Sequence, residues 1–145
     1  MIIKQISIFV ENKAGRLAEI TEAIAAAGID IRALSIADTT DFGILRLIVD
    51  KPEAAALALK EAGLTVSITN VIAVGIDETP GAFSVPMRVL ADAGIDVEYM
   101  YAFISRDTQK AYVILRVADN DIATKALLDK GVTLLDENGF YGLVK

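Results

Sequence analysis

The chain has 145 residues, 54% of them hydrophobic, and a formal net charge of −6. This composition predicts a compact globular protein, and the acidic balance disfavours binding to the phosphate backbone of nucleic acids. His and Cys are absent, which excludes disulfides, thiol nucleophiles, His-based acid and base catalysis, and the usual zinc and iron–sulfur sites.

No apolar run reaches the ~18 residues that a membrane helix needs. Residues 1–5 also lack the pattern of a secretion signal. We therefore expect a cytoplasmic protein with no membrane association, no metal and no cofactor.

The first half of the chain predicts the order strand, helix, strand, strand, helix, strand. Runs of β-branched and apolar residues predict the strands, and Gly28 and Gly63 end the helices. Apolar residues at helical spacing mark one face of each helix: Leu17, Ile20, Ile24 and Ala27 in the first, and Leu57, Leu59 and Ala62 in the second. The expected strands are 2–10, 29–37, 43–49 and 64–69, with a loop at 38–42 and the second helix opening at 50–53.

The second half predicts the same order of elements. We expect strands at 71–76, 95–104, 111–117 and 132–135, and helices at about 81–93 and at 122–130. Pro86 falls inside the first of these helices, where it is expected to remove the hydrogen bond to the carbonyl of Ala82 and to kink the helix. Residues 139–144 are expected to add a strand at a sheet edge.

The two halves are an internal repeat. Residues 11–15 and 27–30 recur sixty-six residues later at 77–81 and 93–96, and later blocks recur at an offset of sixty-eight. A duplicated βαββαβ order predicts an α+β protein with two ferredoxin-like units, 1–70 and 71–145. Each unit would be an antiparallel sheet with both helices on one face.

That arrangement leaves one face of each sheet open. Tyr99, Tyr101 and Phe103 alternate along one predicted strand, so they share a face. They could fill the core of their own unit or form a subunit interface. We expect a homodimer that uses this open face.

Two loops are candidate ligand sites because each precedes a helix, where free N–H groups favour a carboxylate. Gly15 and Gly81 could let a ligand approach the backbone or could simply form the turn. Asn12 could bind the carboxylate or ammonium group of an amino acid, or cap the helix. Asp30 and Asp96 could accept an ammonium group or be solvated strand ends.

Residues 11–17 and 28–31 together resemble the motif of ACT domains, the regulatory modules of amino-acid metabolism. The likeness is closest to the ACT region in the small regulatory subunit of acetolactate synthase. Residues 77–83 with 94–97 look like a second, more divergent copy. Because the likeness covers almost the whole chain, the protein is similar to stand-alone tandem ACT proteins.

The resemblance implies two ACT units side by side with amino acids bound in the groove between them. The first site would use the loop residues Asn12, Ala14, Gly15 and Leu17 with Asp96 or Val97 of the neighbouring unit. The reciprocal site would use Glu78, Pro80, Gly81 and Phe83 with Asp30 or Ile31. Glu78 replaces the Asn there and Pro80 removes a donor, so the first loop is the expected site. Whether the paired units belong to one chain or two stays open.

The leading hypothesis is a non-catalytic regulatory protein that binds a small apolar amino acid, with branched-chain amino acids as candidates. One alternative is a regulatory subunit of acetolactate synthase or of another amino-acid biosynthetic enzyme, which would be its partner. Another is a small enzyme of ferredoxin-like fold, although the chain lacks a glycine-rich phosphate loop. RNA binding on the open sheet would need more stacked aromatics and basic edges.

Overall fold

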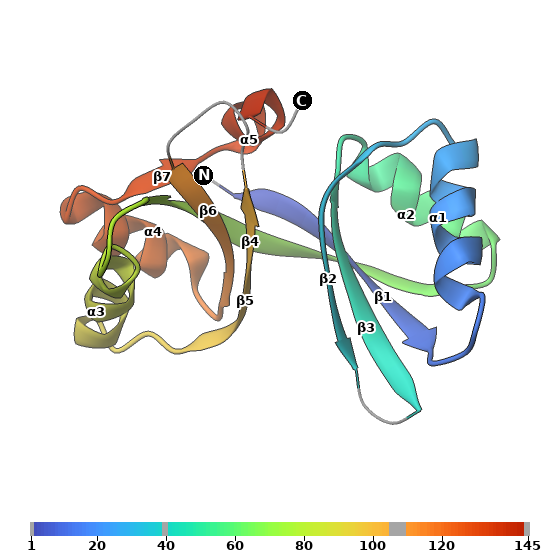
Figure 1. Cartoon of the computed structure of the whole chain (residues 1–145), viewed down its shortest axis with the longest axis horizontal. Helices are drawn as coiled ribbons and strands as arrows, with labels where there is room; N and C mark the ends of the chain where they lie inside the picture. The colour runs from blue at the N-terminus through green and yellow to red at the C-terminus, as the bar shows by residue number, and fades with distance from the viewer. Residues whose placement is uncertain (1, 39–40, 105–109, 144–145) are drawn as a thin grey trace. The chain divides into compact units, whose positions relative to one another are not determined.

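The computed structural model describes residues 2–38, 41–104 and 110–143 (Figure 1). The chain divides into two compact units. One spans residues 4–69 and is called the N-terminal unit; the other contains residues 1–3 and 70–145 and is called the C-terminal unit. Both are built from a sheet and helices, so the predicted α+β fold with two ferredoxin-like units is confirmed.

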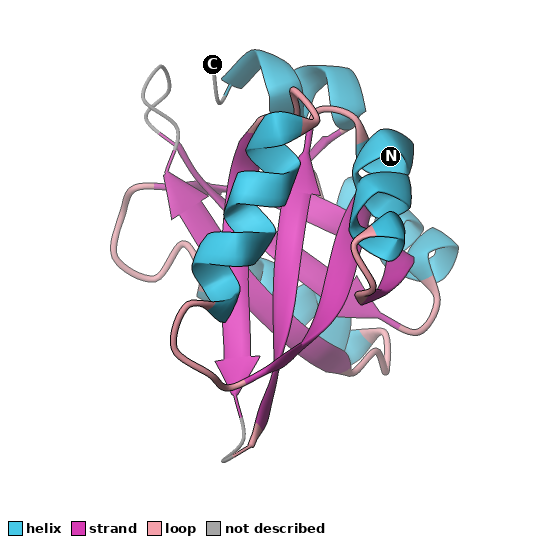
Figure 2. Cartoon of the chain, turned by 90° about the vertical axis from the view of Figure 1, so that its right-hand side faces the viewer, coloured by secondary structure: helices cyan, strands magenta, loops and turns pink. Residues whose placement is uncertain are grey.

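The N-terminal unit contains the first βαββαβ series. Its elements are β1 (Ile3–Glu11), α1 (Arg16–Ala26), β2 (Ile31–Asp38), β3 (Phe42–Val49), α2 (Pro52–Glu61) and the first part of β4 (Thr65–Asp77). The strand order is β2-β3-β1-β4, and β3 is antiparallel to both β1 and β2. Figure 2 shows both helices on one face of the strands.

The C-terminal unit repeats this arrangement. It consists of the rest of β4, then α3 (Ser84–Asp92), β5 (Val97–Ile104), β6 (Lys110–Val117), α4 (Asn120–Asp129), β7 (Thr133–Leu135) and α5 (Glu137–Leu143). The strand order is β7-β4-β6-β5, with antiparallel neighbours.

Each unit buries its own apolar core between sheet and helices. In the N-terminal unit, alternate residues of β1 such as Ile6 and Ile8 pack with Ile20, Ile24 and Leu59. The C-terminal core is built in the same way. Strand β4 contributes Ile72, Val74 and Ile76, and helices α3 and α4 contribute Leu90, Ala123 and Leu127. Period-2 and helical spacing thus place the same sequence positions inside in both copies.

Some predicted helix faces are wrong in detail. Ile20 and Ile24 are buried as expected, but Leu17 is 46% exposed and Ala27 is exposed. In α2 only Leu59 of the predicted set is buried; Leu57 is 59% exposed, Ala62 is exposed, and the small residues Ala55 and Ala56 lie in the interior instead. The buried stripe of each helix is narrower than its apolar stripe, because neither helix has a second layer outside it in its own unit.

Residues 64–69 and 71–76, predicted as two strands, form one. β4 runs without interruption from Thr65 to Asp77. Asn70, at the expected break, lies within the strand, and its carbonyl oxygen accepts hydrogen bonds from Asn120 Nδ2 at 3.2 Å and from the Arg116 guanidinium at 3.5 Å. Those two contacts hold the join between the copies in the extended conformation.

The predicted edge strand at 139–144 is wrong, since this segment is mostly helix α5. The carboxylate of Asp136 accepts the backbone N–H of Gly139 at 2.7 Å, as a helix cap does. The Asp136 carbonyl accepts the N–H of Phe140 at 2.9 Å, and the Phe140 side chain is fully buried. The cap from Asp136 and the burial of the Phe140 ring therefore favour a helix here, although the composition of the segment is typical of a strand.

The predicted kink at Pro86 is also wrong. Helix α3 begins at Ser84 rather than near Gly81, so Pro86 is its third residue. A proline in the first turn sacrifices no helical hydrogen bond, because those N–H groups have no partner within a helix. The carbonyl of Ala82 accepts the N–H of Val85 at 3.3 Å instead. None of the helices in the described ranges is long and apolar enough to cross a bilayer.

Candidate functional site

The loop after β1 makes a tight entry into helix α1. Gly15 has φ 85°, a left-handed conformation that favours glycine, and α1 starts with no side-chain cap. The backbone N–H of Asn12 donates to the Asp41 carbonyl at 2.9 Å, which fastens the loop to the hairpin that precedes β3. The positive end of α1 therefore lies at a loop fixed by this bond, without a side-chain cap and with Glu19 as the acid of its first turn.

A small pocket of about 50 Å³ opens beside this loop. Its wall is apolar and its rim is polar, and its lining residues are Val10, Glu11, Asn12, Lys13, Leu17, Ile36 and Gly43. Of the predicted residues, Asn12 and Leu17 line it, whereas Ala14 and Gly15 are exposed in the turn. The pocket combines a charged rim with aliphatic side chains, the two features that an amino acid requires.

Ile36 and Gly43 belong to this pocket although sequence reasoning missed them. The register pairs Val10 with Gly43 across β1 and β3, and it pairs Ile36 of β2 with Leu45, two residues along β3 from Gly43. Gly43 is closely packed, since a side-chain carbon there would lie 3.3 Å from the carbonyl oxygen of Ala37. Only the register of the three paired strands β1, β3 and β2 would have revealed these two residues, and the internal repeat does not give that register.

Ion pairs surround the loop. The Lys13 ammonium lies 3.2 Å from the Glu11 carboxylate, and Arg16 lies 3.1 Å from Glu19 and 3.8 Å from Glu11. These side chains are largely solvated, so the pairs position the loop more than they stabilise the fold. They leave both signs of charge at the rim of the pocket.

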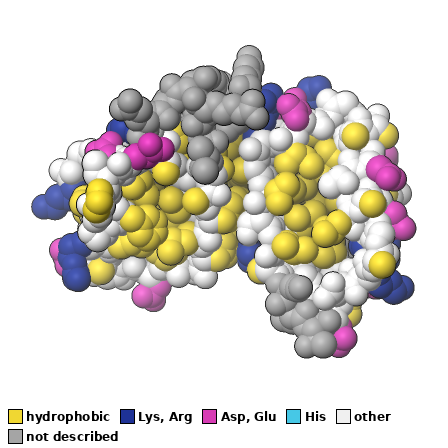
Figure 3. Space-filling model, in the orientation of Figure 1, with side chains coloured by type: hydrophobic (Ala, Val, Ile, Leu, Met, Phe, Trp, Pro, Cys, Tyr) yellow, Lys and Arg dark blue, Asp and Glu magenta, His cyan; other side chains and the backbone are white. Residues whose placement is uncertain are grey.

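The apolar side of the pocket continues onto the edge of the sheet. Leu17, Leu34 and Ile36 are 46%, 58% and 47% exposed, and we call them the β2 edge patch. β2 is the edge strand of its unit. Figure 3 shows hydrophobic side chains gathered between β2 and α1, and again between β5 and α3 in the other unit.

The second loop differs from the first in spite of the repeat. Gly81 keeps the left-handed conformation with φ 84°, and α3 again starts without a side-chain cap. Pro80 and Gly81 line a pocket of about 460 Å³, whereas Glu78 is exposed and Phe83 is 39% exposed, and neither lines it. The two copies of one motif therefore present pockets of different size.

The strand-start residues lie far from the loops of their own units. β1 and β2 are both antiparallel to β3, so the end of β1 and the start of β2 are at opposite ends of the sheet. Asp30 forms an ion pair with Arg32 at 3.4 Å, and its N–H donates to Asp50 at 3.0 Å. Ile31 packs against the core.

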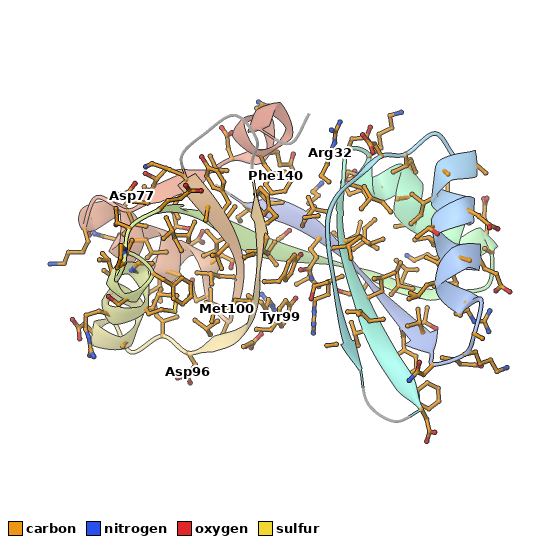
Figure 4. All side chains as sticks on the ribbon, in the orientation of Figure 1. Arg32, Asp77, Asp96, Tyr99, Met100 and Phe140 are labelled. Carbon is orange, nitrogen blue, oxygen red and sulfur yellow. The ribbon has the colours of Figure 1, made fainter. Side chains whose placement is uncertain are left out.

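The same holds in the C-terminal unit. Figure 4 labels Asp77 and Asp96 at opposite ends of it, in agreement with the parallel directions of β4 and β5. Asp96 is exposed, and Val97 packs against the core. A site that joins a loop with one of these aspartates requires a different unit, which stays a prediction.

The aromatic residues of β5 lie on the face away from α3 and α4. Register pairs Phe103 with Tyr112, and their rings stack with centroids 5.5 Å apart. Phe103 also meets Phe140 of α5 at 4.6 Å. Phe103 thus contacts two rings of its own unit, and Tyr99, Tyr101 and Phe103 are all half-buried. A subunit interface on this face stays a prediction.

Within the described residues, no three His, Cys, Asp or Glu side chains are grouped so as to hold a metal ion. The first loop offers hydrogen-bond donors, charges and a small apolar wall. This arrangement can bind a small zwitterion.

Comparison with known proteins shows the family. The sequence profile of the ACT domain pair matches residues 1–144, and the chain belongs to that family. The crystal structure of protein BT0572 from Bacteroides thetaiotaomicron is 41% identical, with a TM-score of 0.91, and the match covers 99% of this chain and 98% of that one.

More distant solved structures share the fold alone. The ligand-free regulatory subunit of aspartate kinase from Thermus thermophilus is 18% identical, with a TM-score of 0.62 over 87% of this chain and 91% of that one. The regulatory subunit from Thermus flavus is 16% identical, with a TM-score of 0.62 over 87% of this chain and 90% of that one. A search of curated proteins finds no match. The expected closeness to the acetolactate synthase subunit stays a prediction.

Proposed function

We propose that this ACT domain pair is a non-catalytic regulatory protein that binds a small apolar amino acid at the Asn12 loop. The observation that carries the proposal is the pocket at that loop, where an uncapped helix start meets an aliphatic wall. The ligand carboxylate would accept N–H groups at the start of α1, which the positive helix end favours.

The remaining groups of the ligand also have partners. Its ammonium group would meet the Glu11 carboxylate or the Asn12 amide oxygen at the rim, and its side chain would contact Val10, Leu17 and Ile36. About 50 Å³ is little more than the share of one or two waters, at roughly 30 Å³ each. The pocket therefore favours small aliphatic side chains, and branched-chain amino acids are the first candidates.

Another ACT unit is expected to complete this site. The pocket is shallow, and its apolar wall runs into the solvent-exposed β2 edge patch. A unit placed over that edge would cover the patch and bring the start of its second strand, Asp96 or Val97, to the ligand. Binding would then favour one arrangement of units over another, which is how a ligand can act on a partner enzyme.

The test is calorimetry of the full chain with each of the twenty amino acids. At the Asn12 loop we expect heat from valine, leucine or isoleucine and weaker heat or none from aromatic amino acids. Any heat from a charged amino acid should be unchanged in Asn12→Ala. Asn12→Ala should weaken binding, whereas Asn138→Ala, an exposed amide in α5, should not. A folded wild-type protein that gives no heat with any apolar amino acid would refute the proposal.

Homodimer formation has its own test, because it does not depend on the ligand. Light scattering after size exclusion should give twice the chain mass of 15.5 kDa. Tyr101→Arg would shift the protein towards a monomer if the face with Tyr99, Tyr101 and Phe103 forms the interface. Leu34→Arg would do so if the β2 edge patch forms it instead.

A further inference from the structure

The larger pocket lies wholly in the C-terminal unit, where β4 ends. Its volume of about 460 Å³ is within the range of small-molecule sites, roughly 300–1,000 Å³. Its walls come from four places in the unit: the ends of β4 and β6, the loop and first turn of α3, the turn after α4, and β7. Two lysines, Lys110 and Lys130, line it.

Lys110 is held in position by residues of two strands. Its ammonium group donates to the Thr133 hydroxyl at 3.1 Å and lies 3.6 Å from the Asp77 carboxylate. Gly75 permits this arrangement, because a side-chain carbon there would lie 3.2 Å from Thr133 and from Tyr112. The glycine lets Thr133 approach β4 closely enough to meet the lysine.

Lys130 supplies a second positive charge. It lies at the end of α4 and forms no ion pair with any residue in the ranges 2–38, 41–104 and 110–143. With Lys110 positive and Asp77 negative, the charged side chains of the pocket sum to +1 in a chain whose net charge is −6. The start of α3 adds its positive dipole end from the same loop.

The first copy of the repeat carries larger, charged side chains at two corresponding positions. At the sixty-six residue offset Ala82 corresponds to Arg16, which pairs with Glu11 and Glu19. Val85 corresponds to that same Glu19. The second copy thus has neither the large guanidinium nor the carboxylate that occupies the loop in the first.

The lysines are also specific to the second copy. At the sixty-eight residue offset Lys110 corresponds to Phe42, whose ring stacks on Phe9 at 5.0 Å, and Lys130 corresponds to Ala62. The structure supports this correspondence, since β1 pairs Glu11 with Phe42 just as β4 pairs Asp77 with Lys110. At these positions the second copy therefore combines smaller side chains, Ala82 and Val85, with two lysines that the first copy lacks.

We infer that this pocket binds a small dicarboxylate, a ligand different from the one proposed for the Asn12 loop. One carboxylate would meet Lys110 and the other Lys130, because charge-assisted hydrogen bonds to ammonium groups are the strong ones. Asp77 would accept an α-amino group, so acidic amino acids fit the three charges better than dicarboxylates without that group. Val85, Pro86 and Val132 supply an apolar wall for the methylene carbons.

The experiment is calorimetry of the full chain with L-glutamate, L-aspartate, succinate and 2-oxoglutarate. L-Glutamine, which lacks the second carboxylate, is the matched probe, and inorganic phosphate tests for general anion binding. We expect the acidic amino acids to bind and glutamine to bind at least about tenfold more weakly, as loss of one charged hydrogen bond implies. No binding of any dicarboxylate, or equal binding of phosphate, would overturn the inference.

Variants separate this site from a general attraction of anions. Lys130→Gln and Val85→Glu should each weaken binding about tenfold, the first by removing a charge and the second by restoring the carboxylate of the first copy. Val85 is 54% exposed and Lys130 is exposed, so neither change disturbs the core. Lys125→Gln, in the same helix and paired with Asp129 outside the pocket, should leave binding unchanged.

The dicarboxylate site and the proposed function can be refuted independently of each other. Asn12→Ala should weaken the binding of apolar amino acids and leave the binding of dicarboxylates unchanged. An equal loss in Lys125→Gln and Lys130→Gln would show only nonspecific attraction and refute the site. Displacement of bound glutamate by valine would refute the claim of two ligands.

Discussion

The backbone N–H of Asn12 lies 2.9 Å from the carbonyl oxygen of Asp41, so the loop before α1 and the hairpin before β3 are joined by a main-chain hydrogen bond. This bond continues the pairing of β1 with β3, and β3 in turn pairs with β2, whose residue Ile36 lines the pocket. The pocket is thus built within one unit from the pairing of three strands, and its residues can be tested singly.

Ile36→Asp should weaken binding of an apolar amino acid by about tenfold, because a carboxylate would replace the aliphatic wall and would remain exposed. Calorimetry measures the change. Leu57→Asp in α2, at a similarly exposed leucine outside the pocket, is the control and should bind like the wild type. Equal loss in both variants would show that the wall has no specific role.

Phe140→Ala should destabilise the protein by about 3–5 kcal/mol, the usual cost of removing a buried ring. The ring is fully buried and contacts Phe103. Urea denaturation followed by circular dichroism measures the free energy of unfolding. Phe83→Ala, a ring 39% exposed in the same unit, should cost far less. A loss for Phe140 no larger than for Phe83 would contradict the packing of α5.

Asp119→Ala should cost about 1 kcal/mol of stability, because the Asp119 carboxylate accepts the backbone N–H of Ile122 at 3.0 Å and caps α4. Asp121→Ala is the matched control, since it removes an acid from the same first turn without removing the cap. Thermal unfolding distinguishes the two, and a loss for Asp119→Ala no larger than that for Asp121→Ala would show that the cap contributes nothing.

Stability should fall in acid partly through Glu53. The hydrogen bond from the Lys4 ammonium to its carboxylate lowers the pKa of Glu53 below 4.5. A lowered carboxyl pKa contributes stability above the unfolded value, and this contribution is lost as pH falls through the folded pKa. Both groups are solvated, so the effect is small.

Glu53→Gln should therefore lower stability at neutral pH and flatten its decline below pH 4.5. Denaturation curves across this range measure both effects. Glu61→Gln, at the end of the same helix, serves as the control. An unchanged pH profile in Glu53→Gln would show that the pair does not contribute.

Sequence periodicity predicted the order of elements because each copy alternates strand and helix patterns that have a direct physical cause. Ile20 and Leu59, for example, lie in the core as their spacing required. The family resemblance also named the Asn12 loop, where the structure has a pocket. The confirmed order of elements comes from features local to a few turns of chain, whereas binding at the Asn12 loop stays a prediction.

The failures have physical causes as well. The apolar residues at 140–144 look like a strand, but the short-range cap from Asp136 to Gly139 and the burial of Phe140 decide for a helix. Pro86 looked disruptive only because the start of α3 was placed three residues too early. Ile36 was missed because its place beside Asn12 depends on register across three strands, a long-range property.

Strand β4 has a consequence for dissecting the protein. A cut after residue 70, which the repeat suggests as the boundary, would sever a continuous thirteen-residue strand. The first fragment would end within β4. The second would begin with the rest of β4, which pairs with β6 and β7. The two halves therefore cannot be separated as independent domains at this point. Both units use part of the same strand, β4, to complete their sheets.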